Sequence, residues 1–269
     1  MADPVGNQRL QEAAAWGPSP MQFADRSAIV TGAARGVGER IARSLAEQGV
    51  DVAIADIDVE GAAEVADDLE AEAGVTATAI ETDVTDYAST MAMAEAAIDA
   101  LDGVDILVNN AGYWTVKPFG EVEPDEWARD VDICFTGTLN CTKAVIDHLT
   151  ESGYGRVLNI VSDAGRIGEP HLAVYSGAKA GVIGFAKALA KEVARHGVTV
   201  NNLALGVTET PGAADFIKSF GRDRLERQYP VGRLGRPTDA ATGALVFLQD
   251  DAEYVTGQTV SVSGGYTTV

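Results

Sequence analysis

Short apolar runs alternate with amphipathic segments along most of the chain. Buried strands are expected at 27–31, 51–55, 75–80, 104–108, 156–161, 198–204 and 258–262, with helix-like patterns between them. Strands that alternate with helices form a parallel sheet covered on both faces. The pattern therefore predicts an α/β fold with a doubly wound parallel sheet of about seven strands and helices on both faces.

The chain divides into a short extension and one large domain. Residues 1–24 precede the first strand and contain glycines, prolines and a possible short helix over 8–16, so we expect a surface arm. Residues 25–269 are long enough for a single domain with a substantial core. The start is not basic and lacks a continuous apolar stretch, and no run is long enough to span a bilayer, so we expect a soluble, cytoplasmic protein.

The chain is strongly acidic, with a formal net charge of −20 and a sequence pI near 4.4. Nucleic acids and anionic membranes would be repelled, which argues against both as partners. Lysine occurs at only six positions, while acids cover the helix-like segment 60–72. A hydrated, lysine-poor surface stays soluble in concentrated salt. We weigh a salt-adapted source equally against an ordinary acidic enzyme.

Cysteines and histidines give no sign of a disulfide or a metal centre. Cys134 and Cys141 are seven residues apart on one predicted helix, about 10 Å along its axis, which is too far for a disulfide. Both are expected to be reduced. His148, His171 and His196 are scattered without partners at metal-ligand spacing, so we predict no metal site.

Three residues in the second half of the chain form a candidate proton-transfer site. Lys179 follows Tyr175 by four residues on one predicted helix face, and Ser162 ends an apolar run thirteen residues upstream of Tyr175. A fixed ammonium near a phenol stabilises the phenolate, and a serine hydroxyl can hold a carbonyl or alcohol oxygen beside it. This chemistry suits alcohol oxidation or carbonyl reduction.

A Tyr-x-x-x-Lys pair is a weak signal by itself, because this chain contains a second one at Tyr113 and Lys117. At the spacing where the first pair has a serine, the second has Ala100, and it follows a glycine in an expected loop. We interpret the second pair as unrelated to catalysis.

A glycine-rich turn near the N-terminus predicts a nucleotide cradle. The first strand leads into Gly32, Gly36 and Gly38, followed by an amphipathic helix over about 39–48. Glycines there allow a tight turn and close backbone approach to a pyrophosphate, and the helix N-terminus offers free N–H groups. Asp56, at the end of the second strand, can accept hydrogen bonds from the adenosine ribose, which favours NAD over NADP. Arg35 opposes this, because it could pair with a 2′-phosphate.

From about Arg26 to the C-terminus, the chain resembles the short-chain dehydrogenase/reductase superfamily. The resemblance rests on the glycine turn, the Ser162, Tyr175 and Lys179 set, and the runs 83–84, 109–112, 257–258 and 263–265. It implies a Rossmann-like domain. It also implies a cofactor site that includes Tyr175 and Lys179 together with Gly32, Arg35, Gly36, Val37, Gly38, Asp56, Asp83, Val84, Asn110, Ala111, Gly112, Gly206, Thr208 and Thr210.

Two positions depart from the family pattern. Cys134 stands where relatives usually have a fourth catalytic residue, an asparagine whose carbonyl is thought to hold a relay water and whose side chain helps to keep a helix kink. We therefore expect a weakened or rerouted proton relay at Cys134. Leu205 precedes Gly206 where a proline is usual, and we expect only a looser turn.

The family's substrate walls correspond here to 113–119, 163–172 and 210–229, which are rich in apolar side chains: Tyr113, Trp114, Ile167, Leu172, Phe216, Phe220 and Tyr229. The expected substrate is a small alcohol or ketone that is apolar, cyclic or an acyl thioester, since the chain resembles hydroxyacyl-CoA dehydrogenases and 3-oxoacyl-carrier-protein reductases. For Arg166 and His171 we favour surface positions over substrate contacts.

The resemblance also implies a homo-oligomer, a tetramer or a dimer, built through the helices that contain Cys134 and Tyr175. A catalytically impaired NAD-binding sensor or scaffold is the alternative function. The intact set of Ser162, Tyr175 and Lys179 argues against it, because such a protein would not need all three.

Overall fold

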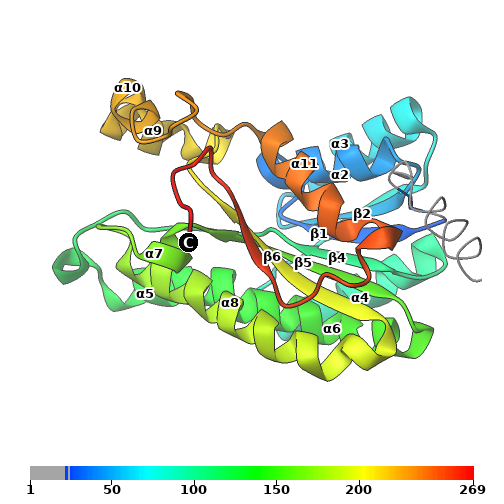
Figure 1. The fold of residues 1–269 in the computed structure, drawn as a ribbon. Helices are drawn as coiled ribbons and strands as arrows, with labels where there is room; N and C mark the ends of the chain where they lie inside the picture. The colour runs from blue at the N-terminus through cyan, green and yellow to red at the C-terminus, as the bar shows by residue number, and fades with distance from the viewer. Residues whose placement is uncertain (1–21, 24) are drawn as a thin grey trace, which may run out of the picture.

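The computed structural model describes residues 22–23 and 25–269, so the expected arm and its short helix lie almost wholly outside the described residues. Seven parallel strands form one sheet in the order β3-β2-β1-β4-β5-β6-β7, shown in Figure 1. Their bounds are β1 Ser27–Thr31, β2 Asp51–Asp56, β3 Ala77–Glu81, β4 Ile106–Asn109, β5 Gly155–Ser162, β6 Val198–Leu205 and β7 Thr259–Val262. The predicted doubly wound parallel sheet is confirmed.

The strand bounds differ most from the prediction at β3 and β4, which each begin two residues late. Gly74 ends the preceding helix with φ of 69°, and the chain needs Val75 and Thr76 to turn back into the sheet. Apolar runs predict burial correctly, but turn residues beside a strand can also be apolar.

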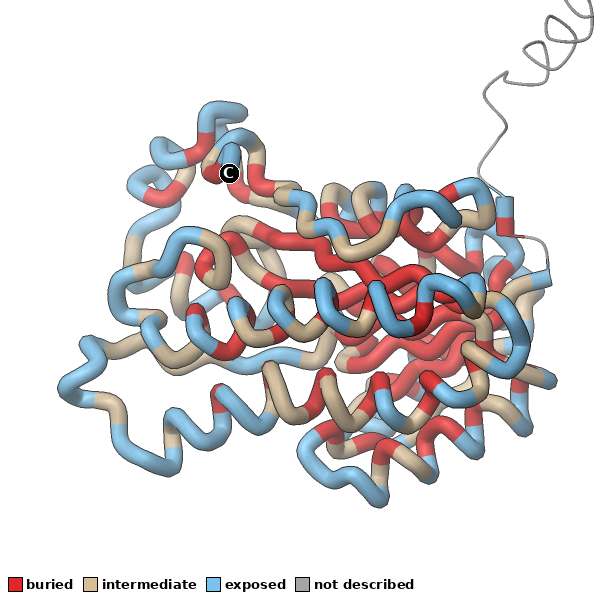
Figure 2. Tube along the Cα trace, turned by 60° about the horizontal axis from the view of Figure 1, so that its bottom comes forward, coloured by how far each residue is buried: buried red, intermediate tan, exposed pale blue. Residues whose placement is uncertain are grey.

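Helices cover both faces of the sheet, as the two layers in Figure 1 show. One face carries α2 Gly36–Ala46, α3 Val59–Ala73 and α11 Pro237–Leu248, and the other carries α4 Tyr87–Leu101, α6 Gly137–Ser152 and α8 Ala173–Val193. Each layer encloses its own apolar cluster against the strands. Figure 2 shows the strands as the most continuously buried part of the chain.

Smaller elements gather at the carboxyl ends of the strands. They are α5 Pro124–Val131, the π-helical turn Asp132–Thr136 that joins it to α6, α7 Ala164–Ile167, α9 Ala214–Phe220 and α10 Arg222–Glu226. Three-residue 3₁₀ turns lie at Phe119–Glu121, Ala194–His196, Pro211–Ala213 and Asp250–Ala252. No helix within the described residues is both long enough and apolar enough to cross a membrane.

The strand order reverses between β1 and β4, which lie side by side although two strands separate them in sequence. At such a point the connections leave in opposite directions and open a crevice beyond the carboxyl ends of the strands. This crevice is where the topology places a ligand.

Candidate active site

Close packing at the end of β1 explains the glycine-rich turn. A Cβ on Gly32 would lie 2.8 Å from the Cα of Ala111, and one on Gly38 would lie 2.4 Å from the Gly32 carbonyl oxygen. Gly32 and Gly36 also have φ of 62° and 71°, in the left-handed region. The Asn110 amide donates to the Thr31 and Gly32 carbonyls at 2.9 and 2.8 Å, tying the turn to β4.

Helix α2 begins at Gly36, earlier than the expected residue 39, and no side chain caps it. Its first N–H groups therefore face the crevice with the positive end of the helix dipole. An anion such as a pyrophosphate is the natural partner for these donors.

Asp56 ties the glycine turn to the end of β2. Its carboxylate accepts from the Ala34 N–H at 2.9 Å and from the Asp58 N–H at 3.0 Å. Asp56 and Arg35 both line the crevice, so a carboxylate and a guanidinium stand at the same end.

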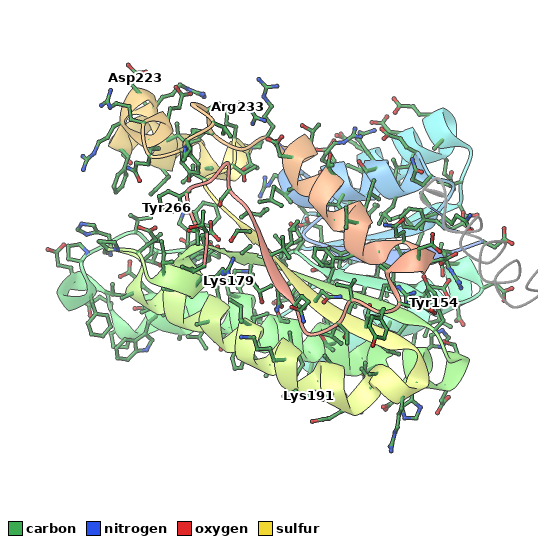
Figure 3. The ribbon with its side chains drawn as sticks, in the orientation of Figure 1. Tyr154, Lys179, Lys191, Asp223, Arg233 and Tyr266 are labelled. Carbon is green, nitrogen blue, oxygen red and sulfur yellow. The ribbon has the colours of Figure 1, made fainter. Side chains whose placement is uncertain are left out.

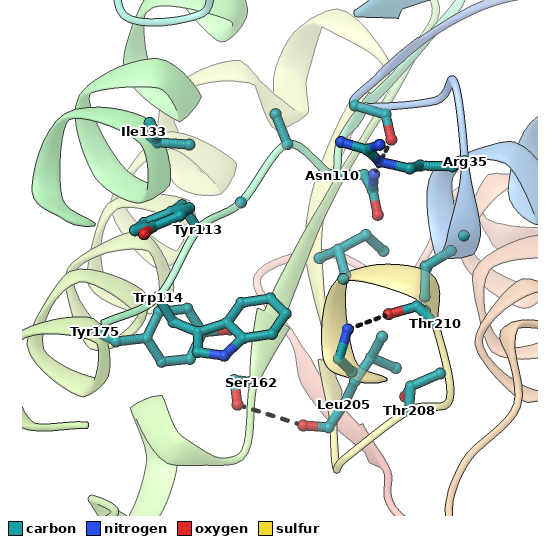
Figure 4. A pocket seen from close by; sticks show the side chains of 18 of the residues that line it. Arg35, Asn110, Tyr113, Trp114, Ile133, Ser162, Tyr175, Leu205, Thr208 and Thr210 are labelled. Carbon is teal, nitrogen blue, oxygen red and sulfur yellow. Dashed lines mark hydrogen bonds between the residues drawn. The ribbon is translucent and has the colours of Figure 1, made fainter. Parts of the chain in front are cut away.

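The crevice is a continuous cavity of about 500 Å³. It runs from the glycine turn to Ser162, Tyr175 and Lys179, and Figure 4 shows part of its wall. Every residue expected to bind cofactor lines it except Gly38, which packs beneath the turn. The other predicted lining residues are Val37, Asp83, Val84, Asn110, Ala111, Gly112, Gly206, Thr208 and Thr210.

Ser162, Tyr175 and Lys179 meet at one end of this cavity. Ser162 ends β5, and its hydroxyl accepts from the Ala164 N–H at 3.1 Å and donates to the Leu205 carbonyl at 3.4 Å. Lys179 is 4% exposed, and its ammonium donates to the Ile160 carbonyl at 2.9 Å. The same ammonium lies 5.8 Å from the centroid of the Tyr175 ring.

Burial raises the pKa of the Tyr175 phenol, and electrostatic interactions with Cys134 and with Asp130 raise it further, whereas a hydrogen bond with Ser162 lowers it. The sequence suggested that Lys179 would lower this pKa. In this structure the ammonium is turned toward the Ile160 carbonyl, and burial is the larger influence on the phenol.

Cys134 is fully buried in the π-helical turn and does not line the cavity. Its thiol donates to the Tyr113 carbonyl at 3.0 Å, and its own carbonyl accepts from the Thr138 hydroxyl at 3.0 Å. The irregular turn is thus present with a cysteine at this position, and the side chain holds the loop that follows β4.

The second Tyr-x-x-x-Lys pair is not arranged like the first. Lys117 pairs with the Glu126 carboxylate, and the Tyr113 hydroxyl accepts from Arg129 at 3.0 Å. Tyr113 nevertheless lines the cavity through its position after β4.

Only part of the expected substrate wall faces the cavity. Tyr113, Trp114, Leu172 and Phe216 line it, whereas Ile167, Phe220 and Tyr229 do not. Ile167 is 47% exposed, and Phe220 and Tyr229 pack in an apolar cluster with α9 and α10. Tyr229 has a supporting role here, because its hydroxyl accepts from the Val207 N–H at 2.7 Å and its ring stacks on Tyr266.

Arg166 and His171 do not line the cavity. His171 has the surface position favoured from the sequence, whereas Arg166 is half-buried. Arg166 donates to the Ser261 hydroxyl, and His171 is exposed in a loop with φ of 67°. Among the residues that the structure describes, no group of His, Cys, Asp and Glu could hold a metal ion.

Several lining residues were not predicted: Ile57, Thr82, Ile133, Ile160, Val161 and Val207. Most of them flank the carboxyl ends of the strands, so their place next to predicted strand ends was the available signal. Pro211, Gly212 and Ala213 also line the cavity, within the predicted wall 210–229.

Comparison with known proteins agrees with this geometry. A family model described as enoyl-(acyl carrier protein) reductase matches residues 32–267. The chain is 39% identical over 248 residues to cis-4-hydroxycyclohexanecarboxylate dehydrogenase from Sinomonas cyclohexanicum, covering 92% of this chain and 98% of the relative.

Two further similar proteins have names that refer to a CoA ester or to an acyl carrier protein. A subunit of a hydroxy(phenyl)methylsuccinyl-CoA dehydrogenase from Thauera aromatica is 38% identical over 245 residues, covering 91% of this chain and 98% of the relative. The crystal structure of 3-ketoacyl-(acyl-carrier-protein) reductase from Brucella melitensis complexed with NADH superposes with a TM-score of 0.84 at 34% identity, covering 90% of this chain and 98% of that one.

Proposed function

The chain belongs to the short-chain dehydrogenase/reductase family, and on that basis we propose that it transfers a hydride between a secondary alcohol or ketone and NAD(H). One observation carries the proposal. Ser162, Tyr175 and Lys179 meet at one end of a single cavity whose other end holds the glycine turn and Asp56. Reacting groups and a dinucleotide cradle therefore share one continuous space.

The residues present fit a nicotinamide dinucleotide. The glycine turn and the uncapped start of α2 would hold the pyrophosphate, and Asp56 would accept from the adenosine ribose. A Cβ added to Gly36 would lie 3.3 Å from the methyl group of Thr210. The glycine turn and the segment after β6 therefore approach each other closely across the cradle. We favour NAD because Asp56 would repel a 2′-phosphate, and the Brucella melitensis relative is a complex with NADH.

When bound, the nicotinamide supplies a hydride acceptor for oxidation or a hydride donor for reduction. Tyr175 removes the proton from the substrate hydroxyl in the oxidative direction and returns it in the reductive one. Ser162 holds the substrate oxygen beside the phenol. The Lys179 ammonium keeps one donor on the Ile160 carbonyl and has two others to stabilise the phenolate and bind the ribose.

Apolar and ring-bearing substrates fit the substrate end best. Tyr113, Trp114, Leu172 and Phe216 line that end, and the only cations in the described lining are Arg35 at the cradle and Lys179 at the reacting end. The named relatives act on a cyclic hydroxy acid, a CoA thioester and a carrier-protein thioester. We propose a cyclic or acyl-thioester secondary alcohol for this chain.

Absorbance at 340 nm tests the proposal, with NAD and NADP each offered beside cyclic alcohols, aliphatic alcohols and hydroxyacyl-CoA esters. Tyr175→Phe is expected to lose nearly all turnover while still binding NADH, because it removes only the group that transfers the proton. Tyr254→Phe is the matched control, since Tyr254 is fully exposed.

Full activity in Tyr175→Phe would refute the assignment of the base. If the parent protein bound NADH but turned over nothing in the panel, the sensor interpretation would replace the enzyme.

We also propose a homo-oligomer in the cytoplasm, as the family resemblance implies. Light scattering coupled to size exclusion measures its mass directly, and a monomer at micromolar concentration would contradict the proposal.

A further inference from the structure

A buried carboxylate below the active site has no role in the mechanism above. Asp130, the next-to-last residue of α5, is 1% exposed. It accepts from the Thr115 N–H at 3.1 Å and from the Thr115 hydroxyl at 3.0 Å, one bond to each carboxylate oxygen. Burying a carboxylate is costly unless hydrogen bonds offset the lost hydration, so the two bonds from Thr115 hold this loop residue firmly.

Asp130 acts together with Cys134, which follows it by four residues and so lies one turn further along the same helical face. The Cys134 thiol donates to the Tyr113 carbonyl, while Asp130 accepts from Thr115. The two side chains therefore hold the loop after β4 on either side of Trp114.

Trp114 is the residue that this arrangement presents to the site. Its ring meets the Tyr175 ring edge to face, with 6.2 Å between centroids, and it lines the cavity. It also packs against the apolar cluster around Ile217 and Tyr229. Figure 4 shows Trp114 beside Tyr175 and Ser162.

We propose that Asp130 is a positioning residue of this active site, which acts through Thr115 to place Trp114 against Tyr175 and so shapes the substrate end for ring-bearing alcohols. The statement about substrate rests on the proposed function. The placement of Trp114 does not, so it can be tested without a substrate.

Asp130 also bears on the charge balance at Tyr175. The phenol interacts with Cys134 from the π-helical turn, Ser162 from β5, Asp130 from α5 and Lys179 from its own helix. Burial raises the pKa of Asp130, the bonds from Thr115 lower it, and nearby Arg129 and Glu126 act in opposite directions. Removing the Asp130 charge would ease ionisation of Tyr175.

The first experiment uses Trp114 as the only tryptophan, in a protein that carries Trp16→Phe and Trp127→Phe. Asp130→Asn keeps the size of the side chain but replaces two charged acceptor oxygens with one neutral acceptor and an NH2 donor, which weakens the hold on Thr115. Trp114 emission is therefore expected to shift to longer wavelength and acrylamide quenching to increase. Thr115→Val removes the hydroxyl bond and keeps the N–H bond, and it is expected to shift emission and quenching in the same direction. Thr115→Ser, which restores the hydroxyl, is expected to match the parent.

Asp125→Asn is the control for loss of charge on α5, because Asp125 is exposed on the same helix. Emission and quenching in this variant are expected to equal those of the parent. If Asp130→Asn and Thr115→Val also match the parent, the inference is wrong. If Asp130→Asn does not fold, Thr115→Val and Thr115→Ser decide the matter.

The second experiment measures turnover of a ring-bearing alcohol and a small acyclic one. Asp130→Asn is expected to lower kcat/KM for the ring-bearing substrate by about tenfold, mainly through KM, as expected for loss of one hydrogen bond to a charged group. In a plot of oxidation rate against pH, the acidic limb of Asp130→Asn should move to lower pH. Thr115→Val keeps the Asp130 charge, so its acidic limb should stay at the pH of the parent.

The positioning role would be overturned if Asp130→Asn lowered kcat/KM equally for both substrates and left the acidic limb of the pH profile at the same pH. If the proposed dehydrogenase activity is wrong, the parent protein will be inactive on both substrates, while the expected fluorescence differences between the variants and the parent will still be seen.

Discussion

Gly38 shows how one small residue supports the whole cradle. A Cβ there would lie 2.4 Å from the Gly32 carbonyl and 2.5 Å from the Asn110 amide, closer than real contacts allow. Gly38→Ala is therefore expected to push α2 away from the turn, destabilise the protein by about 1–3 kcal/mol and weaken NADH binding. Thermal unfolding and a fluorescence titration with NADH measure the two effects.

Gly120→Ala provides the comparison, because nothing lies within 4 Å of a Cβ at that position. Its stability is expected to stay within about 0.5 kcal/mol of the parent. Equal behaviour of the two variants would show that the turn tolerates a side chain at Gly38.

Asp56 makes a structural hydrogen bond and, as proposed above, would set the choice between NAD and NADP. Asp56→Asn retains an acceptor oxygen for the Ala34 N–H but removes the charge. The proposed preference for NAD over NADP is expected to narrow by about tenfold, since like charges a few ångströms apart near the surface repel by ~1–4 kcal/mol. Steady-state kinetics with both cofactors measures this ratio.

Asp58→Asn is the matched control for Asp56→Asn. Asp58 caps α3 through the Gly61 N–H and does not line the cavity. A change in the cofactor ratio as large as that of Asp56→Asn would mean that general loop disturbance, and not the Asp56 charge, sets the preference.

At the scale of elements, an ion pair supports the start of α11. The Arg233 guanidinium donates to both oxygens of Asp239, and the same carboxylate accepts from the Arg236 N–H at 2.7 Å. Figure 3 shows Arg233 close to the start of α11. The hydrogen bond from Arg233 lowers the pKa of Asp239 below its ordinary value of 3.8.

The pKa of Asp239 is lowered on folding, so its stabilising effect is present above about pH 3.8 and is lost as the pH falls below that value. Asp239→Asn is expected to cost only about 0.5–1 kcal/mol at pH 7, because both partners are partly exposed. The difference from the parent should shrink toward pH 3, as chemical denaturation at several pH values can measure.

Asp147→Asn removes a more exposed ion pair with Lys143 and is expected to cost less. A difference for Asp239→Asn that stayed constant down to pH 3 would contradict a charge-dependent effect at α11.

For the whole molecule, the formal net charge of −20 predicts a response to salt. At −20 the carboxylates repel one another in dilute buffer, and salt screens this repulsion within a Debye length of about 10 Å at 0.1 M. The melting temperature is therefore expected to rise between dilute buffer and molar sodium chloride. A modest decrease in pH, which reduces the charge, should act in the same direction.

Differential scanning fluorimetry across these conditions gives the result. A large loss of structure without salt would favour the salt-adapted source, whereas a melting temperature that is independent of salt would leave an ordinary acidic enzyme.

The strand and helix order, the glycine turn and the placement of Tyr175 and Lys179 on one helix could all be predicted, because each depends on local spacing. An apolar run marks a buried strand wherever it occurs, and residues four apart share a helix face in any context. Strand ends were less certain, since turn residues such as Val75 are also apolar.

The sequence by itself thus determined the sheet, the cradle and the positions expected to react. Only the tertiary structure decided that Trp114 and Phe216 face the cavity while Tyr229 and Phe220 support it from behind. It also decided that Cys134 and Asp130 hold the loop after β4. The physical reason is that these roles depend on contacts between segments far apart in the chain, which no local pattern encodes.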